Sequence, residues 1–247
     1  MNHIIILAGG KGTRMKSDLP KVLTLVRGVS IIERLLANVK SVCEKPTIII
    51  GHKGGDVMIA TKNHYHYVLQ EEQRGTGHAI HCAKESLNSK DDIESIIVLP
   101  GDHPLVSAKT ILGLVDQQKK AGAVIALATL VVPSYEGEWS VFEHYGRIVK
   151  DVSGNVTAIT EFKDASEDVR TIKEVNLSYY SFDPKWLWKN IEIIDNKNVS
   201  GEYYLTDLVA IAKSQNKPIV SHAIEDSSEA MGINTLEQLK IVEEHVS

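Results

Sequence analysis

The chain has 247 residues, of which 43% are hydrophobic and 24% are charged, and its formal net charge is −5. This composition is typical of a globular protein with its own core, and the length suits one large domain or two small ones. The acidic balance argues against a broad basic surface for nucleic acid, and no apolar run approaches the ~18 residues that span a membrane. The first strand lacks the cationic region and cleavage site of a signal peptide, so we expect a cytoplasmic protein. Its two cysteines, Cys43 and Cys82, are expected to be reduced and buried.

Strand-length apolar runs alternate with helical patterns through the first half of the chain. The runs IIIL, TIII, SIIVLP and AVIALATLVV begin near residues 4, 47, 95 and 123. The segments that start at residues 30, 78 and 108 carry apolar residues at helical spacing. This alternation predicts an α/β fold with a mostly parallel sheet covered on both faces. Ligands of such sheets bind at the carboxyl ends of the strands.

The second half is more mixed. Residues 145–165 alternate like antiparallel strands around a turn at Gly154-Asn155, and EVNLSYYSFD from Glu174 is another strand. Helices are predicted for WLWKNI, for EYYLTDLVAIAKSQN and for the closing TLEQLKIVEEHV. We therefore expect a single unit over 1–247, in which a nucleotide-binding half (1–125) and a second half (126–247) share one sheet.

The stretch GGKGTRMKSDLPK, which follows the first strand, combines glycines with cationic side chains. Glycines after a strand let backbone N–H groups turn toward an anion, and Arg14 and Lys21 add formal charge. A tight turn with solvated cations is the alternative. The stretch matches neither common phosphate fingerprint, because Met15 stands where G-x-G-x-x-G needs glycine and Gly12 follows Lys11 where a P-loop needs Ser or Thr.

The sequence LAGGKGTRM followed by LPKVL resembles the signature of the sugar-1-phosphate nucleotidyltransferases. It is most similar to the uridylyltransferase domain of the bacterial N-acetylglucosamine-1-phosphate uridylyltransferases. Further motifs follow in the family's order over nearly the whole chain: GHKGGD (51–56), VLQEEQRGTGHA (68–79), PGDHPL (100–105), YGRI (145–148), EFKDA (161–165), EVN (174–176), GEYYLTD (201–207) and GIN (232–234). The resemblance implies a Rossmann-like, glycosyltransferase A-like fold. It also implies a Mg²⁺-dependent reaction of UTP with N-acetylglucosamine 1-phosphate.

The resemblance further assigns site residues. Those expected to bind the nucleotide are Leu7, Ala8, Gly9, Gly10, Gly12, Thr13, Gln70, Gly75, Thr76 and Gly101. Arg14 is expected to hold the β- and γ-phosphates that leave, and Lys21 to bridge the α-phosphate and the sugar phosphate. The residues alone favour another interpretation of QRGTGHA, a helix N-terminus with Thr76 as its cap.

The implied magnesium ligands are Asp102 and Asn234. A carboxylate at a strand end suits Mg²⁺, which takes few protein ligands, although an ordinary turn aspartate before Pro104 is the alternative. Asn234 precedes a capping box, TLEQ, that opens the last helix. The alternate histidines of HYHY (64–67), and the pair His78 and His81, are not expected to bind metal.

The acceptor side carries the implied sugar-binding residues Gly146, Glu161 and Asn176, and also the departures from the family. Segment 132–144 is longer than its counterpart, and Leu177-Ser178 replaces the usual Thr-Gly. Pro100 replaces a tyrosine, and LAGG replaces LAAG. No β-helix acetyltransferase domain is expected, and the protein is expected to be a monomer or dimer. A nucleotidyltransferase for another phosphorylated substrate and a non-catalytic sugar-nucleotide sensor remain the alternatives.

Overall fold

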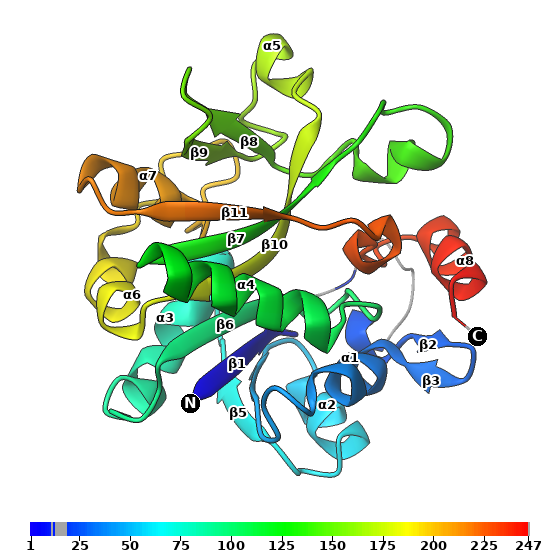
Figure 1. Ribbon diagram of the computed structural model, residues 1–247. Helices are drawn as coiled ribbons and strands as arrows, with labels where there is room; N and C mark the ends of the chain where they lie inside the picture. The colour runs from blue at the N-terminus through cyan, green and yellow to red at the C-terminus, as the bar shows by residue number, and fades with distance from the viewer. Residues whose placement is uncertain (11, 13–18, 247) are drawn as a thin grey trace.

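The computed structural model describes residues 1–10, 12 and 19–246. The predicted strands and one further strand, β11, build one nine-stranded sheet (Figure 1). Its strands are β1 (Asn2–Leu7), β4 (Thr47–Ile50), β5 (His66–Leu69), β6 (Ser95–Pro100), β7 (Ile125–Val131), β8 (Arg147–Lys150), β9 (Val156–Thr160), β10 (Glu174–Phe182) and β11 (Ile219–Ala223). The main path runs β11-β7-β10-β6-β1-β4-β5, and the β8–β9 hairpin joins it through β10. A separate two-stranded sheet pairs β2 (Leu25–Val26) with β3 (Val29–Ser30).

Helices cover both faces of the sheet, as the alternation predicts. The α-helices are α1 (Ile31–Val39), α2 (Gly54–Ala60), α3 (Thr76–Leu87), α4 (Ala108–Ala121), α5 (Glu167–Arg170), α6 (Pro184–Asn190), α7 (Asp207–Ser214) and α8 (Leu236–Glu244). Short 3₁₀ helices are η2 (Lys21–Leu23), η3 (Gly137–Phe142), η4 (Ile191–Ile193) and η5 (Ser227–Ala230). Successive side chains of β1 point to opposite faces. Ile4 and Ile6 pack with α1, α2 and α4, whereas Ile5 packs with α3, α6 and α7.

The two halves of the chain share this sheet. The pairs β1–β4, β1–β6, β4–β5 and β7–β11 are parallel, whereas β10 runs antiparallel between β6 and β7. The expected boundary between the two halves, at residue 125, falls on the first residue of β7. The α/β fold with a mixed, mostly parallel sheet is confirmed.

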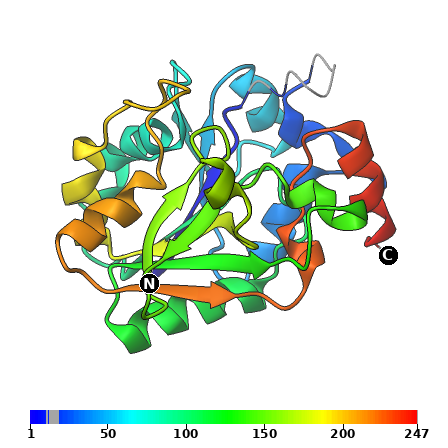
Figure 2. The ribbon, with the colours of Figure 1, turned by 90° about the horizontal axis from the view of Figure 1, so that it is seen from above.

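The C-terminal helix α8 packs on the small β2–β3 sheet, far from it in sequence (Figures 1 and 2). Val26 and Val242 are both fully buried in the cluster between them. The capping box predicted for Thr235 and Gln238 is present, with each residue's side chain accepting from the other's backbone N–H. This packing places the loop before α8 beside the main sheet.

Two predictions of secondary structure were incomplete. The helix predicted for residues 202–216 begins only at Asp207, because residues 202–205 bond to the turn before α3 instead. Strand β11 was missed because its side chains are mostly half-buried and show no alternation.

Cys43 and Cys82 are free thiols, half-buried rather than fully buried.

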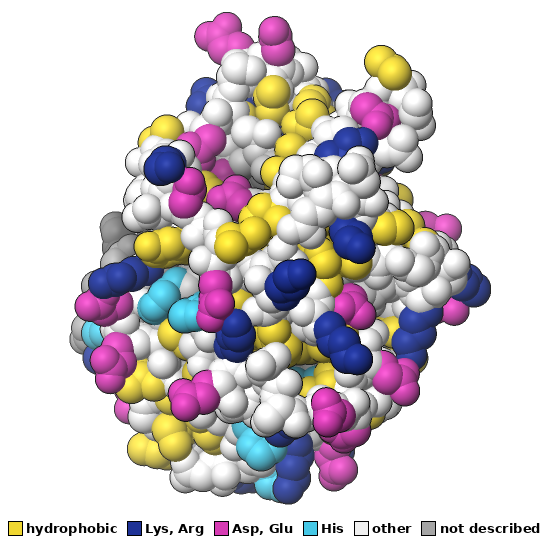
Figure 3. Space-filling view, turned by 90° about the vertical axis from the view of Figure 1, so that its left-hand side faces the viewer, with side chains coloured by type: hydrophobic (Ala, Val, Ile, Leu, Met, Phe, Trp, Pro, Cys, Tyr) yellow, Lys and Arg dark blue, Asp and Glu magenta, His cyan; other side chains and the backbone are white. Residues whose placement is uncertain are grey.

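The surface matches the charge balance of the chain. On the face in Figure 3, the described lysines and arginines are intermixed with acidic side chains rather than gathered into a basic patch. No helix in the described part of the chain is long and apolar enough to cross a membrane.

Arg147, on β8, is fully buried and holds the long 132–144 segment against the sheet. Its guanidinium donates to the carbonyl oxygens of Tyr145, of Glu143 at 2.8 Å and of Arg170 at 3.2 Å. It also lies 4.3 Å from the centroid of the Tyr135 ring. One side chain thus ties together loops on both sides of β8.

Replacing Arg147 with methionine is expected to lower the free energy of unfolding by about 3 kcal/mol, because buried carbonyls lose their donor. Urea unfolding followed by circular dichroism measures this change. Lys173→Met is the matched control, since Lys173 lies 4.4 Å from the centroid of the same Tyr135 ring but is exposed. The control should cost less than about 1 kcal/mol, and equal losses in the two variants would contradict the role given to Arg147.

Candidate active site

The parallel strands β1, β4, β5 and β6 end at one edge of the sheet, and a cavity of about 350 Å³ opens there. We call it the strand-edge cavity. Its lining includes seven residues predicted from the sequence: Leu7, Gly9, Gly10, Gln70, Gly75, Thr76 and Asp102. The fold therefore brings together predicted residues that are up to 95 positions apart in the sequence, from Leu7 to Asp102.

Glycines let the strand ends approach closely here. The N–H of Gly101 donates to the carbonyl oxygen of Leu7 at 2.9 Å, and a Cβ at position 101 would lie 2.7 Å from that oxygen. Ala8 is buried, and its N–H donates to the carbonyl oxygen of Ile49 at 2.9 Å. Gly12 has a φ of +60° and lies against Lys21. These predicted residues shape the edge of the sheet without lining the cavity.

Gln70 follows β5 and is 5% exposed. Its Nε2 donates to the carbonyl oxygen of Gly75 at 3.0 Å and to Nδ1 of His78 at 3.1 Å. Its Oε1 lies toward Gly9, where a Cβ would be only 3.3 Å away. Gly9, the glycine of LAGG that replaces the second alanine of LAAG, thus leaves the Oε1 of Gln70 uncrowded.

The turn before α3 is closed by the segment 201–205. Gly75 has a φ of +108°, and a Cβ there would lie 2.6 Å from the carbonyl oxygen of Tyr203. The N–H of Gly77 donates to that same oxygen at 2.8 Å. Gly75, not Thr76, is the N-cap of α3, and the Thr76 hydroxyl accepts from the N–H of Leu205 at 3.0 Å. The capping interpretation of Thr76 is therefore wrong.

Lys21, Asp102 and Asn234 meet at the rim of the strand-edge cavity. The Lys21 ammonium lies 2.5 Å from Oδ2 of Asp102 and 3.0 Å from Oδ1 of Asn234. The N–H of Ile233 donates to the carbonyl oxygen of Asp102 at 3.0 Å, which holds the loop before α8 at the end of β6. Two acceptor oxygens thus converge on one cationic group, and we call these three residues the cation cluster.

The Asp102 carboxylate is ionised at neutral pH. Burial alone would raise its pKa, but the Lys21 ammonium and the neighbouring His103 lower that pKa to about 2. Burial lowers the pKa of His103 to about 4, against the opposing effect of Asp102. His103 is therefore neutral near pH 7, and its Nδ1 bonds to the Tyr179 hydroxyl at 2.6 Å.

Buried neutral histidines predict a stability that falls with acid. The pKa of His3, lowered by burial and by Lys90, is also about 4 in the fold against 6.5 for the free side chain. The unfolded chain binds a proton that the fold does not between these values, so stability should fall from pH 6.5 to pH 4, by on the order of 2–3 kcal/mol per histidine. Urea unfolding of His3→Gln from pH 4.5 to 7.5 should show a flatter profile than the natural chain.

The glutamine can still bond to the Thr47 hydroxyl, which contacts Nε2 of His3 at 2.9 Å. His64→Gln, on an exposed side chain, is the control and should leave the profile unchanged. Parallel profiles for His3→Gln and the natural chain would contradict the buried neutral state.

A second cavity, of about 520 Å³, lies beside the first and shares Glu202 with it. Glu161, one of the predicted sugar-binding residues, lines this acceptor-side cavity and accepts from the Thr206 hydroxyl at 3.2 Å. Burial raises the pKa of Glu161. A Cβ on Gly146 would lie 3.5 Å from Oε2 of Glu161, so these two predicted residues are neighbours.

Asn176 is buried, and its amide is held within the fold. Its Nδ2 donates to the Tyr180 hydroxyl at 2.7 Å, and its Oδ1 accepts from the N–H of Ser178 at 3.1 Å. Ser178 lines the strand-edge cavity with a φ of +62°, a left-handed conformation that glycine adopts more easily. The departure from Thr-Gly thus puts a strained serine in the lining of the strand-edge cavity.

Arg14 and Thr13 lie outside the described residues. Among the described residues, no group of three or more His, Cys, Asp or Glu side chains is arranged to hold a metal ion. Glu202 and Gln73 also line the strand-edge cavity, although the sequence did not single them out. Glu202 belongs to a segment for which the sequence predicts a helix, and a helix there would not bring Glu202 to the turn before α3.

The fold is that of the nucleotidyltransferase class. A solved structure, UDP-glucose pyrophosphorylase complexed with UDP-glucose, matches with a TM-score of 0.74 over 99% of this chain and 98% of that chain. Its sequence identity is 16%, so the match shows the fold alone. The chain belongs to the family of MobA-like NTP transferase domains, whose family model matches residues 4–174.

Curated relatives agree with this family. The Bifunctional protein GlmU of Lactococcus lactis subsp. lactis is 38% identical over 231 residues, which are 93% of this chain and 48% of the relative. The Bifunctional protein GlmU of Heliobacterium modesticaldum is 39% identical over 236 residues, 95% of this chain and 50% of the relative. The chain spans about half the length of these relatives. The resemblance to the nucleotidyltransferases is confirmed.

Proposed function

We propose that the protein joins UTP and N-acetylglucosamine 1-phosphate to form UDP-N-acetylglucosamine and pyrophosphate. The observation that carries this proposal is the cation cluster, which lies at the rim of the strand-edge cavity with the acceptor-side cavity adjacent. The identity to the two GlmU proteins supports the same choice of substrates.

The residues present fit a magnesium ion. Mg²⁺ prefers carboxylate and amide oxygens and needs few protein ligands. The Lys21 ammonium occupies the point where an oxygen of Asp102 and an oxygen of Asn234 converge, so the site already accommodates positive charge. Asp102 and Asn234 would hold the ion, and when bound it would neutralise the phosphates and orient them.

The chemistry requires positioning more than proton transfer. The oxygen of the sugar phosphate that attacks the α-phosphorus is already anionic, so no general base is needed. The obstacle is repulsion between two polyanions. Lys21 would lie between the α-phosphate and the sugar phosphate, while Arg14 would hold the departing β- and γ-phosphates.

The neutral parts of the substrates fit the two cavities. Gln70 and the backbone of Gly75 and Thr76 would bind the uracil edge. On the acceptor side, Glu161 offers oxygens to sugar hydroxyls, and Gly146 leaves room for the ring beside it. Pyrophosphate is the product that leaves.

The test is pyrophosphate release by the purified protein with Mg²⁺. UTP, dTTP and CTP are each combined with the 1-phosphates of N-acetylglucosamine, glucosamine, glucose and N-acetylgalactosamine. Turnover confined to UTP with N-acetylglucosamine 1-phosphate is the expected result. Faster turnover with another sugar would overturn the acceptor assignment, and binding of UDP-sugar without turnover in any combination would favour a sensor.

A further inference from the structure

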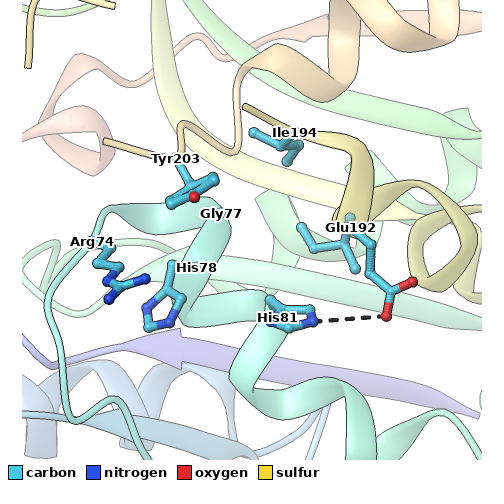
Figure 4. A pocket seen from close by; sticks show the side chains of 8 residues that line it. Arg74, Gly77, His78, His81, Glu192, Ile194 and Tyr203 are labelled. Atoms are coloured by element: carbon cyan, nitrogen blue, oxygen red, sulfur yellow. Dashed lines mark ion pairs between the residues drawn. The ribbon is translucent and has the colours of Figure 1, made fainter. Parts of the chain in front are cut away.

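His78 lies on α3 between the strand-edge cavity and a third cavity of about 380 Å³ on the outer side of that helix. Figure 4 shows the ring from this outer side, between Arg74 and His81. No role for His78 follows from the fold, because one face of its ring borders open space rather than core. Its inward nitrogen nevertheless contacts Gln70.

Two acceptors, the Gly75 carbonyl and the His78 ring, hold the Gln70 amide in one orientation. The carbonyl oxygen of Gly75 can only accept a hydrogen bond, so the amide nitrogen and not the oxygen must face it, at 3.0 Å. The same nitrogen lies 3.1 Å from Nδ1 of His78. Its two hydrogens are therefore assigned to these two acceptors. Nδ1 must be unprotonated, and the neutral ring carries its hydrogen on Nε2.

The amide oxygen is consequently the group presented to the strand-edge cavity. Among the described residues, none donates a hydrogen bond to Oε1 of Gln70. An oxygen at this place accepts from the ring N–H of uracil or thymine. The corresponding ring nitrogen of cytosine is itself an acceptor and would oppose it.

We propose that His78 is a positioning residue: its Nδ1, together with the Gly75 carbonyl, holds the Gln70 amide with the oxygen toward the base, which selects nucleotides that carry a ring N–H. The proposal rests on the proposed function and specifies how that function chooses its nucleotide. Without Nδ1, one amide hydrogen loses its acceptor and the Gly75 carbonyl alone holds the amide nitrogen, so the orientation with the oxygen toward the base is less strongly preferred. A lost hydrogen bond of this kind costs about 1 kcal/mol, which corresponds to roughly a 5- to 10-fold loss of discrimination.

The experiment measures the Kd of UTP and of CTP by calorimetry with Mg²⁺, and kcat and KM with the best sugar phosphate. His78→Leu removes the acceptor, and His78→Ala repeats the test with a side chain too small to strain the fold. His78→Asn keeps an acceptor near the position of Nδ1. His81→Leu, on the same outer cavity and without contact to Gln70, is the matched control.

We expect the ratio of the CTP Kd to the UTP Kd to fall 5- to 10-fold in His78→Leu and His78→Ala, with kcat at saturating UTP changed less than about 3-fold. His78→Asn should keep most of the ratio, and His81→Leu all of it. Long-range ¹H–¹⁵N correlation spectra should show the neutral Nε2–H form of His78.

An unchanged ratio in His78→Leu and His78→Ala, equal losses for both nucleotides, or an Nδ1–H form would overturn the proposal. So would a loss in His78→Asn as large as in His78→Leu, since that would indicate packing. Failure of the proposed function is distinguishable, because nucleotide binding is measured without turnover. A natural chain that binds UTP selectively but turns over no sugar phosphate would refute the function while leaving the role of His78 intact.

Discussion

Replacing Lys21 with methionine is expected to lower kcat for pyrophosphate release by about 10²- to 10³-fold, which is the usual cost of removing one group that stabilises charge in the transition state. Methionine keeps the length of the side chain but not its charge. In the proposed reaction both phosphates would meet at the rim where this ammonium lies, so its contribution should be larger in the transition state than in binding. KM for UTP should therefore change less than kcat.

Two controls separate charge from other effects in this experiment. Lys119→Met removes an exposed lysine that pairs with Glu94 at 2.7 Å on the surface, and activity should stay within about 2-fold. Lys21→Arg restores the charge in a bulkier form and should recover part of the loss. Near-normal turnover in Lys21→Met would refute the assignment of Lys21 to the phosphates.

Local patterns predicted most of the fold. The apolar runs of β1, β4, β6 and β7 and the helical spacing of α1 and α4 depend on periodicity, which short stretches of sequence carry. The structure of segment 202–206 cannot be predicted from local periodicity. The sequence pattern favours a helix there, yet the backbone of the segment bonds to the α3 turn more than 100 positions away, as the N–H of Leu205 does to the Thr76 hydroxyl. Tertiary contacts of this kind override local propensity and leave no mark in the segment itself.

The candidate site was predicted mainly through family motifs and only in part from physical patterns. Strand ends indicated the glycines after β1 and Asp102 after β6, since parallel strands finish at one edge, whereas Gln70 came from the resemblance alone. Nothing local indicated that Asn234 would meet Asp102, because their approach depends on where α8 packs. The orientation of the Gln70 amide could not be predicted from the sequence either. It depends on the carbonyl oxygen of Gly75 and on Nδ1 of His78, which approach the amide only once the turn before α3 has folded.

The second large effect is expected at Asp102. Asp102→Asn keeps the shape of the side chain but removes the charge that would hold magnesium, and kcat should fall by about 10²- to 10³-fold. Affinity for Mn²⁺, measured by electron paramagnetic resonance in the presence of UTP, should fall as well. Asp91→Asn, on an exposed loop before β6, is the matched control and should change neither quantity.

The same variant has a second signature in stability, because the carboxylate pairs with Lys21 where both side chains are largely buried. The pKa of Asp102 is about 2 in the fold against 3.8 for the free side chain. Its ionised form therefore stabilises the fold above pH 4, and this contribution is lost as the pH falls toward 2. Asp102→Asn should be less stable than the natural chain at pH 7 by on the order of 2 kcal/mol, and this difference should shrink toward pH 2–3. A variant that loses activity and Mn²⁺ affinity yet keeps full stability at pH 7 would show that Lys21 and Asp102 are not paired in the free protein. A variant that keeps Mn²⁺ affinity would remove Asp102 from the proposed metal site.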